Sequence, residues 1–195
     1  MGCNSQPTAA PVVTVSTIAD AAHRLERLGY GFDKESEVLG QDFTTYKTED
    51  GVDGYSVELM SWTGDSKVMG FTMSCRTDVA GFNSNEVRQG LWNRLESDFL
   101  ELVDAAGDYK RAMDNMKKAE GDGVPRYEGR ATTADGWQIE VIEYSGHYKN
   151  EKRDIGVGLI MARHLATEEA VPPNAINEWN DLMEKGRKAR QSDSE

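Results

Sequence analysis

Two glutamates occupy matching places in two similar stretches of the chain. Glu58 lies within residues 54–64, and Glu140 lies within residues 136–146. Two carboxyl groups that flank a glycosidic bond can act as general acid and as nucleophile or base when they are roughly 5–9.5 Å apart. Because sequence positions do not give that distance, a hydrolase that uses Glu58 and Glu140 is one alternative for this chain.

The other chemistry-bearing residues form no catalytic or metal-binding motif. The histidines, His23, His147 and His164, are far apart, and none belongs to an HxH or HExxH pattern. No serine lies in a GxSxG turn, and no glycine-rich phosphate loop is present. Aspartates beside glycines lack the spacing of a calcium loop and are typical of turns. The sequence therefore predicts a non-catalytic protein without a metal or other cofactor.

The two cysteines stand in different surroundings. Cys75 lies in an alternating apolar run, which predicts a buried thiol. Cys3 follows Gly2 and precedes a polar, proline-containing stretch that is typical of an unstructured tether. The Gly2–Cys3 pair with this tether resembles the start of a mature bacterial lipoprotein. The resemblance implies a lipid on Cys3, a place in the bacterial cell envelope, and membrane attachment only through that anchor.

Two other interpretations of the amino terminus stay open. Met-Gly-Cys could direct myristate to Gly2 and palmitate to Cys3, although Gln6 stands where that motif prefers Ser or Thr. The terminus could also be an ordinary disordered segment, which would leave a cytoplasmic location as the alternative.

Charge and hydropathy exclude some partners. The chain of 195 residues has a formal net charge of −12, whereas proteins that bind nucleic acid neutralise phosphates with clustered Lys and Arg. No run reaches the roughly 18 apolar residues of a membrane-spanning helix. We therefore expect no nucleic-acid partner and no transmembrane segment.

Similar blocks recur in the same order along the chain, which predicts an internal duplication. Residues 54–64 resemble residues 136–146, residues 70–73 resemble residues 158–161, and a Trp-Asn pair follows each set at Trp92 and Trp179. The predicted organisation is given by four segments: a disordered tether over 1–16, a first unit over 17–106, a second unit over 107–190, and a disordered tail over 191–195.

Hydrophobic periodicity gives each unit the order helix, three antiparallel strands, helix. The first unit has a helix that begins at Thr17, a weak strand over 37–47, a hairpin of 55–62 with 68–76, and a helix after Asn83. The second has a helix capped by Asp108 that runs to about residue 119, a strand over 126–133, a hairpin of 137–144 with 155–163, and a closing helix around Trp179. The predicted fold is α+β, with the helices on one face of the sheet.

Alternation along the hairpins assigns side chains to faces. One face should form the core with Tyr55, Val57, Leu59, Met69, Phe71, Met73 and Cys75. The opposite face should carry the candidate partner surface, Glu58, Met60, Trp62, Arg76, Glu140, Tyr144 and His164, together with Ile142, Gly158, Ile160 and Ala162. Two simpler possibilities are that helices cover this face and that Glu58 forms a salt bridge with Arg76.

The sequence thus favours a binding or interaction module for a protein or a small apolar ligand. A second possibility is a small acidic chaperone or adaptor that binds a peptide along an open sheet edge. The order of elements resembles that of type III secretion chaperones, on the strength of the run Leu25, Leu28, Gly29 and Tyr30 and of the Trp-Asn pairs.

Overall fold

The computed structural model describes residues 17–38, 40–48, 53–103, 105–119, 124–148 and 151–164. The described helices are α1 (Ile18–Arg27), α2 (Val79–Asn83), α3 (Asn85–Leu102) and α4 (Ala106–Asp114). The described strands are β1 (Gly31–Val38), β2 (Gln41–Lys47), β3 (Gly54–Trp62), β4 (Gly70–Thr77), β5 (Lys117–Lys118), β6 (Arg126–Thr132), β7 (Trp137–Tyr144) and β8 (Ile155–His164). The predicted tether with Cys3, the closing helix around Trp179 and the tail lie outside the described residues.

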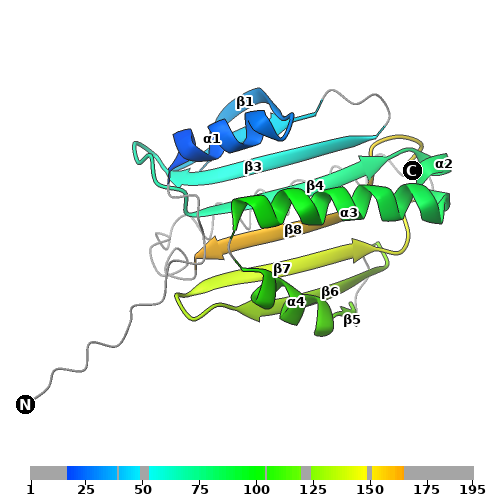
Figure 1. Cartoon of the computed structure of the whole chain (residues 1–195). Coiled ribbons are helices and arrows are strands. Elements are labelled where there is room, and N and C mark those ends of the chain that lie inside the picture. Colours follow the sequence, from blue (N-terminus) through cyan, green and yellow to red (C-terminus); the bar gives the residue numbers. More distant parts are fainter. Residues whose placement is uncertain are drawn as a thin grey trace, which may run out of the picture. The chain divides into compact units, whose positions relative to one another are not determined.

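The strands form one antiparallel sheet of eight strands in the order β1-β2-β3-β4-β8-β7-β6-β5 (Figure 1). Its centre is the pairing of β4 with β8, in which Ser74 is opposite Leu159. Strands β1–β4 form one half of the sheet, on one side of this junction, and strands β5–β8 form the other half. The predicted α+β class with antiparallel strands is therefore confirmed.

The first half contains one strand more than the sequence predicted. The strand expected over 37–47 is mainly β2, and a further strand, β1, precedes it and forms a hairpin with it around Gly40. Gly40 has a φ of 76°, a conformation that glycine adopts without strain. The sequence did not predict β1, because its side chains are nearly all exposed and the strand therefore shows no apolar alternation.

The second half also differs from its prediction. The helix expected to run to about residue 119 ends at Asp114, and the short strand β5 follows it. Asp108 does not cap this helix: the capping position is Ala105, which makes no side-chain cap, and Asp108 instead pairs with Arg111 one turn on. The sequence signal was real but misplaced, because an acidic residue also suits the first turn of a helix.

Two other helix starts show how local sequence sets the boundaries. The hydroxyl oxygen of Thr17 accepts a hydrogen bond from the Asp20 amide at 3.1 Å, so the predicted cap of α1 is confirmed. In α3 the capping side chain is Ser84, whose hydroxyl accepts from the Val87 amide, whereas Asn83 is the last residue of α2. The predicted start of that helix was therefore wrong by one residue.

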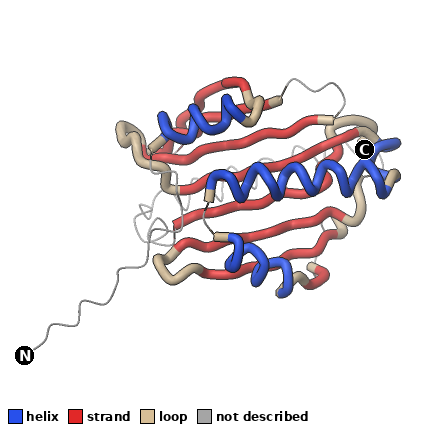
Figure 2. The backbone as a smooth tube through the Cα atoms, viewed as in Figure 1, coloured by secondary structure: helices blue, strands red, loops and turns tan. Residues whose placement is uncertain are grey.

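Helices α1, α3 and α4 are drawn in front of the sheet in Figure 1, and Figure 2 shows the same arrangement by type of element. Glycines let two of them approach closely. A Cβ atom at Gly158 of β8 would overlap the ring of Trp92 in α3, and one at Gly129 of β6 would overlap the Ala112 carbonyl of α4. The side of the sheet that carries Gly129 and Gly158 is called the first face.

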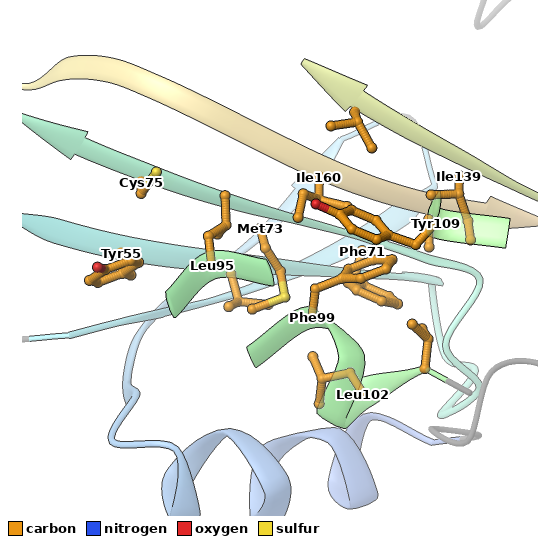
Figure 3. Packing of buried hydrophobic residues seen from close by; sticks show 14 of the residues in the cluster. Tyr55, Phe71, Met73, Cys75, Leu95, Phe99, Leu102, Tyr109, Ile139 and Ile160 are labelled. Atoms are coloured by element: carbon orange, nitrogen blue, oxygen red, sulfur yellow. The ribbon is translucent and has the colours of Figure 1, made fainter. Parts of the chain in front are cut away.

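A hydrophobic core lies between the first face and α3 (Figure 3). Phe71, Met73 and Ile160 point from the sheet toward Leu95 and Phe99 of α3. The sequence-predicted core residues of β3 and β4 are all buried, and Cys75 is 1% exposed, whereas the predicted core residue Met69, just before β4, is only half-buried. Burial raises the pKa of the Cys75 thiol to about 12, so this thiol is protonated at neutral pH.

Candidate functional site: the second face of the sheet

The opposite side of the sheet, called the second face, is defined by strand register. Glu58 of β3 is opposite Thr72 of β4, Thr72 is opposite Met161 of β8, and Met161 is opposite Glu140 of β7. Directly paired residues of neighbouring strands project to the same side of a sheet. The two glutamates therefore share a face, as the sequence predicted.

Most of the predicted surface residues lie on this face. Met60 and Trp62 alternate with buried Leu59 and Ser61, and Arg76 follows the same alternation along β4. Tyr144 lies two steps along β7 from Ile142, which is opposite Leu159. Apart from Glu58, which is exposed, and Glu140, which is buried, these predicted residues are half-buried.

The prediction for β8 was wrong by one residue, which moves His164 to the first face. Ala162 is opposite Phe71, and Ile160 is opposite Met73, so both belong to the first face. His164 follows the same alternation and is opposite Trp137. The residues of β8 on the second face are Leu159, Met161 and Arg163. The error arose because residues 158–161 were aligned with residues 70–73, although the two blocks present opposite faces.

The surroundings of His164 are those of a structural residue. Its ring meets the ring of Trp137 edge-on with the centroids 5.5 Å apart. Its Nε2 atom lies 3.1 Å from the carbonyl oxygen of Asp135. These contacts fix the imidazole at the end of β8, away from the other predicted surface residues.

Glu140 is held by a strong ion pair. It is 6% exposed, and its Oε1 atom accepts from Nε and Nη2 of Arg130 on the neighbouring strand at 2.8 and 2.6 Å. This hydrogen bonding raises the pKa of the Arg130 guanidinium. Glu140 therefore anchors β7 to β6, and its carboxylate is occupied.

The geometry does not support catalysis by the two glutamates together. Three strand spacings separate Glu58 from Glu140, which is roughly 14 Å at about 4.8 Å for each step. That distance exceeds the range for either class of glycoside hydrolase. The expected salt bridge between Glu58 and Arg76 is also not formed, because Arg76 pairs with Asp154 at 3.3 Å.

The apolar part of the second face has two groups. The first-half group is Phe43, Met60 and Trp62, and Phe43 is directly opposite Met60. The second-half group is Ile142, Leu159 and Met161. Between the groups, β4 presents only small side chains toward its middle, namely Gly70, Thr72 and Ser74. Sequence alternation did not predict Phe43, Leu159 and Met161, because β2 shows only a weak strand pattern and the predicted register of β8 places Leu159 and Met161 on the other face.

Two hollows are lined by other parts of the structure, and one of them reaches the second face at Tyr144. One of about 580 Å³ is lined by residues of α3, α4 and the sheet, including Arg88, Trp92, Met113 and Glu143. There, Arg88 and Glu143 form an ion pair, with Arg88 Nη2 3.1 Å from Glu143 Oε1. The other, of about 300 Å³, lies by the turn after β7 and includes Tyr144 and His147.

The remaining histidines lie apart from each other: the ring of His147 is edge-on to Phe82, and His23 is an exposed residue of α1 beside Glu26.

Among the described residues, no three His, Cys, Asp or Glu side chains are grouped as a metal site would require. No helix in the described part of the chain is both long and apolar enough to cross a bilayer.

Comparison with known proteins gives no relative: no family model, no curated protein and no solved structure matches the chain. The case for a function therefore depends on the second face and on the sequence.

Proposed function

We propose that this protein is a non-catalytic binding module that uses the second face to dock a protein or a small apolar ligand. The observation that carries the proposal is the pair of apolar groups on either side of β4, each a short distance from charged side chains. Apolar patches bordered by polar residues are common at interaction sites. The small residues of β4 would let an occupant approach the backbone along the middle of the sheet.

The proposal includes an address. The Gly2–Cys3 pair and the tether favour a lipid-anchored protein of the bacterial cell envelope, with slack between the anchor and the folded body. Metabolic labelling with a palmitate analogue tests this, with Cys3→Ser as the control. Label on the native protein and none on the variant is expected. A full-length precursor that takes up no label would instead favour the cytoplasmic chaperone or adaptor.

The proposal also includes an origin by duplication, with helices of both halves on one face. Its support is the mirrored strand order: moving outward from the β4–β8 junction, one half runs β4, β3, β2, β1 and the other runs β8, β7, β6, β5. Val57 and Leu59 in one half correspond to buried Ile139 and Val141 in the other. Residues 158–161 of β8 match residues 70–73 in sequence but are displaced by one residue in face. A one-residue shift within β8 would account for this.

Site-specific photocrosslinking tests the docking face. A photoreactive residue in place of Met60 should give discrete adducts in native membranes, because it lies within one apolar group. The same residue in place of Asp114, an exposed position of α4, is the matched control and should give none. Identical adduct patterns at the two positions would reject the second face as the docking surface.

A further inference from the structure

Among the described strands, none pairs with the outer edge of β1. β1 ends the sheet, and its residues from Gly31 to Glu37 are all exposed. An edge strand presents unpaired backbone N–H and C=O groups that can accept another strand. The opposite end differs, because β5 covers part of β6, and Asn115, which follows α4, donates to the Arg130 carbonyl at 3.2 Å.

An acidic groove of about 460 Å³ runs beside this edge on the first face. Glu35 is opposite Thr44, and Glu37 is opposite Asp42, so all four residues line it from the same side. Asp65 adds a fourth carboxylate. Among the described residues, no Lys or Arg lines the groove, and neither Glu35 nor Glu37 forms an ion pair.

Two of these carboxylates are held in place by the fold. Asp42 accepts from the hydroxyl of Thr63 at 3.2 Å, and Asp65 accepts from the Lys67 amide at 2.9 Å. Glu35 and Glu37 are two residues apart, so their side chains repeat at about 6.6–6.8 Å along the strand. An added strand with a basic side chain at every second position has the same repeat.

At the start of β1, Phe32 supplies an apolar contact. It is 61% exposed, and its ring meets the Tyr46 ring edge-on, with the centroids 6.1 Å apart. Asp33 is paired with Lys47 at 2.9 Å. The remaining charges oppose pairing between two copies, because Glu35 and Glu37 outnumber Lys34 in each. The edge is thus protected against self-association and complementary to a basic strand.

We propose that the outer edge of β1 binds an extended, basic segment of a partner protein as an added strand. Backbone hydrogen bonds provide the pairing, while alternate Lys or Arg side chains enter the acidic groove and a neighbouring apolar side chain covers Phe32. This surface is separate from the second face, and the inference does not depend on the function proposed for that face.

A fluorescent octapeptide of alternating Lys and Thr is the probe, and its anisotropy is measured on the full chain. The variant Glu35→Lys/Glu37→Lys should weaken binding at least tenfold. The matched variant Glu101→Lys/Asp114→Lys changes the net charge equally at exposed sites elsewhere and should change binding by less than threefold. Equal weakening by the two variants would overturn the proposal, because binding would then reflect net charge alone.

The same peptide N-methylated at its four central residues separates strand addition from charge attraction. It keeps every lysine but loses the backbone donors, so its binding should fall at least tenfold. Undiminished binding would contradict an added strand.

Hydrogen exchange supplies the location. Amides of β1 should gain protection when the peptide binds, and protection confined to any other element would also overturn the proposal. Sedimentation without peptide should show a monomer, and a dimer abolished by Glu35→Lys/Glu37→Lys would mean that the edge serves a second copy.

Discussion

At the scale of single residues, one buried polar cluster ties α3 to the turn before β1. The hydroxyl of Tyr30 donates to Asp98 Oδ2 at 2.8 Å, and Arg94 Nε lies 3.5 Å from the same oxygen. The Arg94 guanidinium also lies over the Tyr55 ring, 4.5 Å from its centroid. Buried polar groups are tolerated when they are paired in this way, and removing one partner leaves the others unsatisfied.

The carboxylate of Asp98 should make stability depend on pH. Burial raises its pKa, although the Tyr30 hydroxyl and Arg94 partly oppose the change. The folded state therefore binds this proton more tightly than the unfolded state, whose carboxyl has a pKa of about 3.9. The stabilising effect of that proton is complete below the unfolded pKa and is lost as pH rises through the folded pKa.

Asp98→Asn tests this, because an amide does not titrate. Urea unfolding of both proteins between about pH 3 and pH 7 gives a difference in unfolding free energy. As pH rises from about 3.9, the native protein should lose unfolding free energy relative to Asp98→Asn, and the difference should then level off. Asp114→Asn, at an exposed position, is the control. A difference that stays constant across the range would mean that Asp98 has the same proton affinity in both states.

The sequence predicted some residues of the candidate site and missed others for a definable reason. Glu58, Met60 and Trp62 follow simple alternation beside buried Leu59, so their face could be inferred. His164 could not be placed, because strand alternation has a period of two and a shift of one residue reverses every side chain. The ion pair of Glu140 with Arg130 depends on register between strands, which a single sequence does not specify.

At the scale of elements, the contact between α3 and β8 depends on Gly158. A Cβ there would overlap the Trp92 ring and lie 2.9 Å from the Ile142 carbonyl oxygen. Gly158→Ala should therefore destabilise the protein by about 1–3 kcal/mol through overpacking. Trp92→Ala, which removes a half-buried ring, should cost about 3 kcal/mol, the lower end of the range for large aromatic residues.

Together the two substitutions should cost less than the sum of their separate effects, since Trp92→Ala opens the space that the new methyl group needs. Chemical denaturation of the four proteins measures this coupling. Strictly additive losses would show that the ring and Gly158 do not meet in solution.

A glycine inside α3 supplies the opposite expectation. Gly90 lies inside α3, and a Cβ there would meet nothing within 4 Å. Gly90→Ala should raise the free energy of unfolding by roughly 0.5–1 kcal/mol, because alanine has the higher helix propensity. The midpoint of a urea titration is the readout. A lowered midpoint would place another group against this position.

Elements with an apolar period were predicted well, and those without one were not. The caps and stripes of α1 and α3 and the two hairpins follow their patterns within a residue or two. β1 consists almost entirely of exposed residues, so it is a strand only through its pairing with β2. β5 is two residues long and is likewise set by tertiary pairing rather than by local preference.

At the scale of the whole molecule, both halves share one sheet, and this has a measurable consequence. The β4–β8 pairing is the junction, and Met73 of β4 is fully buried at it, opposite Ile160. Separation of the halves would expose this core surface and a central strand edge on each side. The described body should therefore unfold as a single cooperative unit.

Met73→Ala in this junction should lower the global free energy of unfolding by about 2–5 kcal/mol, as expected for a buried methionine. Native-state hydrogen exchange should then show the most protected amides of β3 and of β7 losing the same amount, although β7 belongs to the other half. The exposed Tyr127→Ala on β6 is the control and should change both values little. A loss restricted to β1–β4 would mean that the halves unfold separately, and that the single sheet joins two independent folding units.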